Sequence, residues 1–144
     1  MTTTEPAVRL AHISDRPLDA AAVEEAVTGP HYGAVVVFTG KVRDHDGGQA
    51  VAALEYSAHP EAARFLHRVC AELADSTGLP VAAVHRVGAL TIGDDAIVVA
   101  VAAAHRAEAF TACAALVDRI KHEVPIWKRQ LFADGLSEWV NACG

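Results

Sequence analysis

Apolar and polar positions alternate along the first third of the chain in a way that predicts short strands and one helix. A short strand is expected near Val8–Ile13, followed by a helix over Pro17–Val27, where apolar residues recur at helical spacing. In the next strand, Gly33–Arg43, the residues Val35, Val36, Val37 and Phe38 are apolar in succession, so we expect both of its faces to be covered. With a period of two, Lys41 and Arg43 share one face, and two cations therefore emerge side by side at the end of this strand.

In the rest of the chain, apolar residues again recur either at the strand period of two or at helical spacing. Further strands are expected at Val51–Tyr56, Val81–Leu90, Ala96–Ala103 and Ile126–Phe132, and Asp134-Gly135 turns the chain toward Trp139 and Val140. The two strands on either side of Gly93–Asp95 are expected to pair across that turn. Helices are expected at Pro60–Thr77 and Arg106–Glu123. These elements predict an α+β fold with prominent antiparallel pairing, and residues 1–144 are expected to form a single domain.

The helix over Arg106–Glu123 ends in a lysine that is a candidate for chemistry. Apolar side chains at helical spacing predict its buried stripe, which consists of Phe110, Cys113, Ala114 and Val117. Lys121 extends this stripe, and its partial desolvation favours the neutral amine, whereas the helix C-terminus favours the ammonium. The balance of the two effects stays open. The plain alternative is a lysine whose stem packs on the surface and whose charge lies in water.

A second lysine lies seven residues further along. Lys128 follows Pro125 and Trp127, and a rigid proline with a bulky indole favours a turn that brings the two ammonium groups together. Only three lysines occur among twelve basic residues, and two of them lie in this segment. The alternative is an ordinary edge strand whose lysine discourages aggregation.

An anion site is also indicated where an apolar strand passes into a helix. His105 and Arg106 stand at the expected helix start, where unpaired backbone N–H groups attract anions. The alternative is a histidine N-cap beside a solvated arginine. Residues 106 and 121 of one straight helix are about 22 Å apart. If Arg106 and Lys121 serve one substrate, they must come from different subunits, which predicts a dimer with composite sites.

Composition limits where such a site is found. The chain of 144 residues is 52% hydrophobic and 21% charged, as in ordinary globular proteins, and its net charge of -6 disfavours binding to nucleic acids or anionic membranes. An anion site must therefore be local. Three widely spaced cysteines do not suit a disulfide framework, so reduced thiols are expected. The longest apolar run has nine residues and no signal peptide is evident, so a cytoplasmic protein without a membrane partner is expected.

Several well-known motifs are absent from the sequence. Gly33–Lys41 lacks the glycine and hydroxyl positions of a phosphate-binding loop, and neither GxSxG nor HExxH occurs. Asp44-His45-Asp46 offers potential metal ligands, but a solvated turn is favoured in a short loop that ends in glycines. We therefore expect neither a metal nor a cofactor.

Four segments together resemble the large subunit of molybdopterin synthase, the MoaE family. They are Gly33–Arg43, His85–Gly88, Ala104–Arg106 and Lys121–Lys128. The resemblance covers almost the whole chain and implies an α/β hammerhead fold. It also implies an enzyme of molybdenum-cofactor biosynthesis that converts cyclic pyranopterin monophosphate into molybdopterin with its dithiolene. In that family each sulfur arrives as a thiocarboxylate on the Gly-Gly tail of a small ubiquitin-like subunit, and large subunits form a central dimer with one small subunit at each end.

The resemblance also assigns roles to residues. It implies that Lys121 and Lys128 are catalytic and that Lys41, Arg43, His105 and Arg106 bind the substrate, the last two from the other protomer. Two positions depart from the family: an acidic residue is common where Gln130 stands, and no basic residue follows Trp139-Val140. Two alternatives compete with the enzyme. One is a non-catalytic adaptor that captures the partner's C-terminal tail, and the other is a sensor of phosphorylated ligands.

Overall fold

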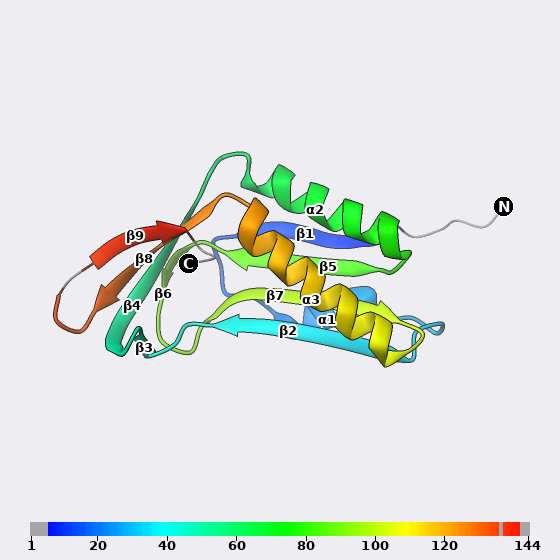
Figure 1. Ribbon diagram of the computed structural model, residues 1–144, viewed down its shortest axis with the longest axis horizontal. Helices are drawn as coiled ribbons and strands as arrows, with labels where there is room; N and C mark the ends of the chain where they lie inside the picture. The colour runs from blue at the N-terminus through cyan, green and yellow to red at the C-terminus, as the bar shows by residue number, and fades with distance from the viewer. Residues whose placement is uncertain (1–5, 136, 142–144) are drawn as a thin grey trace.

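The computed structural model describes residues 6–135 and 137–141, which form two sheets and three helices (Figure 1). The helices are α1 (Ala20–Val27), α2 (Ala62–Thr77) and α3 (Arg106–Glu123). The strands are β1 (Val8–Ser14), β2 (Ala34–Lys41), β3 (His45–Asp46), β4 (Gln49–Ala58), β5 (Val81–Arg86), β6 (Gly88–Leu90), β7 (Asp95–Ala103), β8 (Ile126–Phe132) and β9 (Ser137–Asn141). The predicted α+β class is confirmed.

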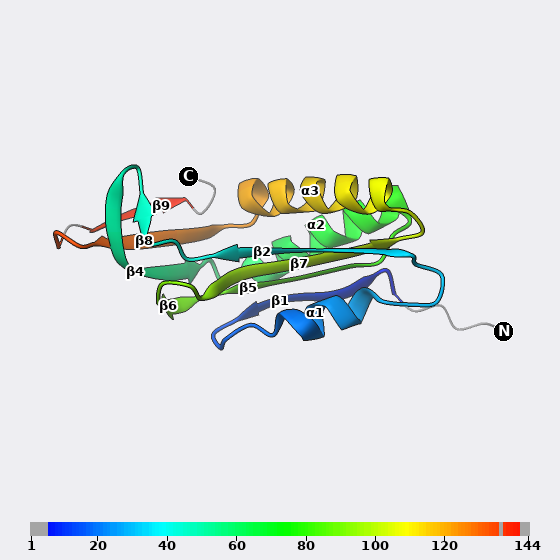
Figure 2. The same cartoon turned by 90° about the horizontal axis from the view of Figure 1, so that it is seen from below.

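The first sheet has four strands in the order β1-β5-β7-β2 and contains most of the core. Only β1 and β5 run parallel; the other pairs in this sheet are antiparallel, as the sequence predicts. Helices α2 and α3 cover one face and α1 covers the other (Figure 2). Val36 and Phe38 of β2 pack toward α2 and α3, and Val35 and Val37 pack toward α1. The expected cover on both faces of this strand is therefore confirmed.

The second sheet lies beyond one end of the first and has the order β3-β4-β8-β9, with β6 also paired to β4 (Figures 1 and 2). Helix α3 leads directly into this sheet, because β8 begins two residues after Val124. The connection is held by backbone hydrogen bonds: the N–H of Val124 donates to Ile120 at 3.1 Å, and the N–H of His59 donates to Pro125 at 3.0 Å. The C-terminal end of α3 is thus fixed against the second sheet.

Helix boundaries differ from the predicted ones at their N-terminal ends. Helix α1 begins at Ala20 and not at Pro17, because Asp19 is its N-cap and accepts a hydrogen bond from the Ala22 N–H at 3.1 Å. Helix α2 begins at Ala62 and not at Pro60, after a turn closed by the Ala62 N–H on the His59 carbonyl. Its predicted buried stripe is confirmed, and the buried set comprises Ala62, Leu66, Val69, Cys70, Leu73 and Ala74.

Two predicted strands are interrupted. The segment expected as one strand over Val81–Leu90 breaks at Val87, and Gly88 takes a positive φ of 97°. Its first part pairs with β7 as predicted, but its last part, β6, pairs with β4 in the second sheet. The strand expected to run to Arg43 ends at Lys41, after an irregularity in its pairing beyond Gly40.

The predicted stripe of α3 is wrong in half of its positions. Phe110 is 61% exposed and Ala114 is exposed, although Cys113 and Val117 are buried. The buried face instead consists of Ala109, Ala112, Cys113, Leu116, Val117 and Ile120. These residues also recur at helical spacing, so an alanine-rich helix offers two overlapping stripes. Packing against β2, β7 and α2 selects the second one.

The cysteines in the described part of the chain are buried. Cys70 and Cys113 are free thiols, and burial raises the pKa of Cys70 to about 12 and raises that of Cys113. Neither is a reactive thiolate near neutral pH. Cys143 lies outside the described residues. None of the helices described here has the length and apolar character that crossing a membrane requires.

Candidate functional site

A cavity of about 140 Å³ lies where the end of α3 meets the two sheets. Its lining consists of Gly40, Lys41, Val42, Arg43, His45, Leu54, Tyr56, Ala96, Lys121, Lys128 and Gln130. All three lysines of the chain contribute to it, together with one arginine. No carboxylate is among these lining residues. We call this cavity the cationic pocket.

The second sheet supplies one wall of the cationic pocket through its strand register. Lys128 of β8 stands opposite Tyr56 of β4, and Gln130 stands opposite Leu54. Side chains two residues apart share a face, so these four project to the pocket side. Trp127, which is 39% exposed, belongs to the opposite face of β8.

The last turn of α3 supplies a second wall of the cationic pocket through Lys121. Lys121 is half-buried there, one tight connection away from Lys128. The structure brings both side chains to the lining of one cavity, as the proline turn between them predicts. The helix C-terminus carries partial negative charge, which stabilises a cation in this turn.

The end of β2 supplies the remaining cations. The Lys41 Nζ lies 2.6 Å from the Asp95 Oδ1, so an ion pair at the rim holds this lysine. Arg43 is more loosely paired, with its Nη2 3.5 Å from the Asp46 Oδ1. The strand reaches this position only with glycine at residue 40, because a Cβ there would lie 2.7 Å from the Cγ2 of Ile97. A close backbone approach therefore delivers both cations to the pocket.

A neutral histidine supports the pocket from behind. His85 is 4% exposed, and its Nδ1–H donates to the Arg86 carbonyl at 2.7 Å. Its ring meets Tyr56 edge to face, with centroids 5.0 Å apart. Burial lowers the pKa of His85 to about 4, and the nearby charge of Lys121 acts in the same direction. His85 is therefore neutral at pH 7, and the pocket's positive charge is carried by its lysines and arginine.

The turn before β4 approaches the pocket more closely than expected. Asp44 and His45 are exposed and pair with each other at 2.7 Å, in keeping with a solvated turn. Asp46 differs from them: a hydrogen bond from the Gln130 side chain lowers the pKa of its carboxyl, and the charges of Lys128 and Arg43 lower it further. Within residues 6–135 and 137–141 no three His, Cys, Asp or Glu side chains are grouped as metal ligands would be.

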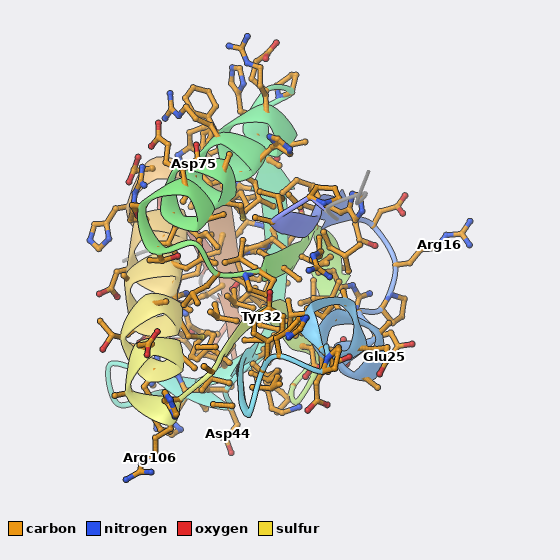
Figure 3. All side chains as sticks on the ribbon, turned by 90° about the vertical axis from the view of Figure 1, so that its right-hand side faces the viewer. Arg16, Glu25, Tyr32, Asp44, Asp75 and Arg106 are labelled. Carbon is orange, nitrogen blue, oxygen red and sulfur yellow. The ribbon has the colours of Figure 1, made fainter. Side chains whose placement is uncertain are left out.

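His105 and Arg106 lie outside the cationic pocket. Both are exposed at the N-terminal end of α3, the end opposite Lys121. Figure 3 shows Arg106 projecting away from the body of the molecule at the start of this helix. His105 holds the N-cap position, but its side chain makes no capping hydrogen bond. A single chain therefore does not bring these two residues to the lysines.

Tyr56, His85 and Asp46 are site residues that sequence reasoning missed. Tyr56 lines the pocket because β4 pairs with β8, which is distant in the sequence, so no local pattern encodes this contact. Asp46 lies in a local hairpin of β3 with β4, and it comes beside the pocket because that hairpin meets β8 through β4. Gln130 carried a usable signal, because it lies two residues after Lys128 and shares its face of the strand.

The fold and the pocket together define a class of protein, an α+β scaffold that gathers lysines and an arginine into a pocket whose charge suits an anionic ligand. A family model described as "MoaE protein" matches residues 13–123, and the chain belongs to this family. The catalytic subunit 1 of molybdopterin synthase from Mycobacterium tuberculosis is 42% identical over 138 residues, covering 94% of this chain and 93% of that one. The catalytic subunit from Staphylococcus carnosus is 40% identical over 130 residues, covering 89% and 86%.

Two solved structures are also similar to this chain. The crystal structure of molybdopterin synthase from Staphylococcus aureus matches with a TM-score of 0.83 and 38% identity, covering 89% of this chain and 94% of that one. A complex of subunits 1 and 2 of molybdopterin-converting factor from Helicobacter pylori matches with a TM-score of 0.69 at 20% identity, covering 94% and 90%. The second likeness concerns the fold alone.

Proposed function

We propose that this chain is the catalytic subunit of a molybdopterin synthase. It transfers sulfur from the thiocarboxylated C-terminus of a small ubiquitin-like subunit to cyclic pyranopterin monophosphate, and the product is the dithiolene of molybdopterin. The observation that carries the proposal is the cationic pocket, which gathers every lysine of the chain in a member of the MoaE family. The catalytic subunits from M. tuberculosis and S. carnosus support it.

The pocket's chemistry suits this reaction. Sulfur that arrives on a partner requires no nucleophilic cysteine, and the buried thiols Cys70 and Cys113 are poorly placed to serve as one. The substrate's phosphate requires a local positive site on a chain whose net charge is -6. The cationic pocket supplies that local positive charge.

The two catalytic candidates have separate tasks in this proposal. Lys121 approaches the thiocarboxylate end and assists proton transfer or polarises its carbonyl. Lys128 orients the pterin and stabilises its charged intermediate. Lys41 and Arg43 hold the phosphate at the rim, where Lys41 is already oriented by Asp95.

A second copy of the chain completes the site. Arg106 and Lys121 belong to opposite ends of an unbroken α3, about 22 Å apart by the helical rise. One small substrate cannot reach both ends. We therefore assign His105 and Arg106 to the pocket of the partner protomer, so that each site of the dimer is composite.

The surface for this dimer lies between α3 and β2. A groove of about 370 Å³ is lined by Val36, Val37, Phe38, Phe110, Cys113, Ala114, Val117 and Asp118. Strand β2 is at the edge of the first sheet and pairs only with β7 among the described residues (Figure 1). An open strand edge beside an exposed Phe110 is a surface that a second copy covers.

We infer a twofold axis on this groove from the spacing of residues along α3. Cys113 and Ala114 lie midway between Arg106 and Lys121 on α3. A twofold axis at this midpoint sets two α3 helices antiparallel and places Arg106 of one copy level with Lys121 of the other. Phe110 then faces Val117 of the second copy in the same way.

The small subunit is the second partner. The fold is also found in a protein from H. pylori that was solved as a complex of two subunits, and the likeness to it is limited to the fold. The cationic pocket opens between the two sheets, where an extended Gly-Gly tail can deliver its thiocarboxylate. We also place the reaction in the cytoplasm.

Reconstitution tests the proposed function. The purified chain is mixed with thiocarboxylated small subunit and cyclic pyranopterin monophosphate, and dithiolene product is measured. We expect product from the wild-type chain and a loss of about 100-fold or more in K121A and in K128A. Both variants should keep the wild-type melting temperature, because neither side chain is part of the apolar core.

Arg16→Ala is the matched control. Arg16 is an exposed cation in the connection between β1 and α1 and projects into solvent in Figure 3, so its loss removes one positive charge that does not line the pocket. It should keep wild-type activity. Partner binding without any product from the wild-type chain would favour the adaptor, and near-normal turnover in both lysine variants would refute the assignment of the lysines.

A further inference from the structure

The hairpin formed by β3 and β4 holds one carboxylate beside the cationic pocket. His45 pairs with Ala50 and Asp46 pairs with Gln49 across a turn of two glycines. Both glycines have positive φ, 57° at Gly47 and 81° at Gly48, as a tight hairpin turn requires. The turn therefore fixes Asp46 directly after a residue that lines the pocket.

Asp46 contacts pocket residues from two other elements. Its Oδ1 lies 3.5 Å from the Arg43 Nη2 on the segment after β2. Gln130 on β8 and the positive charge of Lys128 both act on its carboxylate and lower the pKa of Asp46. Gln130 is only 5% exposed, so its amide has few alternatives to this carboxylate.

The pocket's charges give this contact its importance. Four cations around about 140 Å³ repel one another, and none of the lining residues is an acid. Among the described side chains, three carboxylates outside the lining pair with lining residues: Asp95 with Lys41, Asp46 with Arg43 and Asp44 with His45. Of these three, Asp46 is the one on which the charge of Lys128 in β8 also acts.

We propose that Asp46 is a positioning residue of the cationic pocket, which orients Arg43 and Gln130 and offsets positive charge beside Lys128. The inference rests on the proposed function, because it concerns the same site. Without this carboxylate, Arg43 and Lys128 turn to the incoming anion as their nearest partner. The substrate then binds at least as tightly but in a less productive position.

Moving the negative charge from residue 46 to residue 130 tests the proposal. D46N keeps the size of the side chain and its ability to accept from Gln130 but removes the charge. We expect kcat to fall about tenfold while KM for the pterin substrate does not rise. In D46N/Q130E the carboxylate is moved to the other end of the same contact, and we expect it to recover most of the lost kcat. Asp75→Asn, an exposed carboxylate at the far part of α2, is the matched control.

A second readout does not depend on activity. In Q130E two carboxylates face each other across the contact, which makes one of them hold a proton more tightly than in the unfolded chain. Stability is then lost as the pH rises. We expect the melting temperature of Q130E, relative to the wild type, to be lowest near pH 7 and to improve by pH 5, and D46N/Q130E to lack this dependence.

The outcomes separate this inference from the proposed function. If the wild type makes product and D46N has the wild-type kcat, or if D46N/Q130E is no better than D46N, the role of Asp46 is overturned. If the wild type makes no product, the proposed function fails. In that case the melting curves of Q130E test the contact between Asp46 and residue 130. If the melting temperature of Q130E depends on pH as that of the wild type does, the contact is overturned as well.

Discussion

At the residue scale, the pocket depends on a histidine that carries no charge. His85 is buried behind Tyr56, and its Nδ1–H is committed to the Arg86 carbonyl, so the imidazole stays neutral beside Lys121. A charged imidazole there would add a fifth cation to a crowded site. The neutral ring lets the pocket keep its lysines close together.

The buried His85 makes the stability of the fold depend on pH. Its pKa falls from 6.5 to about 4 on folding, so between these values the unfolded chain binds a proton that the folded chain does not. The contribution of the neutral His85 ring to the free energy of unfolding is fully present above pH 6.5 and is lost as the pH falls toward 4. The loss amounts to about 3 kcal/mol. Urea denaturation at a series of pH values measures it.

His85→Gln is the informative comparison, because glutamine keeps a hydrogen-bond donor but does not titrate. Its free energy of unfolding should change less between pH 7 and pH 4 than that of the wild type. Parallel curves for the two proteins would show that His85 is not the group responsible.

Single-residue patterns predicted part of the site. Lys121 and Lys128 were brought together by a proline turn that is visible in the sequence, and the structure has that turn. Asp46 and Tyr56 were not predictable in this way. Their place depends on the register of β4 against β8, which is set by tertiary packing and not by any local period, although the Gly47-Gly48 turn that pairs β3 with β4 is a local signal.

At the element scale, α3 joins the core to the proposed dimer surface. Its bounds, Arg106–Glu123, agree with the prediction, because its strand-to-helix start and its terminal proline are local signals. Its buried face was predicted wrongly, because two apolar stripes overlap and only the neighbouring elements choose between them. The exposed residues of the rejected stripe, Phe110 and Ala114, line the groove beside β2.

Disrupting this groove should separate the two protomers. Phe110→Glu places a charge on a side chain that is 61% exposed in one chain, so the fold tolerates it while a dimer interface does not. We expect the dimer dissociation constant to rise by at least about 30-fold, measured by analytical ultracentrifugation. Product formation should fall with the dimer fraction.

Thr111→Glu is the control for Phe110→Glu. Thr111 is exposed on the neighbouring position of α3 but belongs to the cleft toward α2, not to the groove beside β2. The same charge there should leave the dimer intact. Equal dissociation by both variants, or by neither, would contradict the proposed surface.

At the scale of the whole molecule, the site is divided between the two ends of one helix. The cationic pocket occupies the junction of the two sheets, and the His105-Arg106 pair lies at the opposite end of α3 (Figures 1 and 3). The α+β class and the order of the elements followed from the sequence. The second sheet did not, because β6 leaves the expected hairpin to pair with β4. Because β6 follows β5 of the first sheet and pairs with β4 of the second, it links the two sheets at the junction where the pocket lies.

The most direct measurement compares two tagged heterodimers in the reconstituted reaction. One pairs an R106A chain with a K121A chain, and the other pairs the wild type with an R106A/K121A double variant. If each pocket takes Lys121 from one protomer and Arg106 from the other, the first heterodimer keeps one intact site and about half of the wild-type activity, while the second keeps none. The reverse result, with activity only in the second heterodimer, would contradict a site shared between two copies.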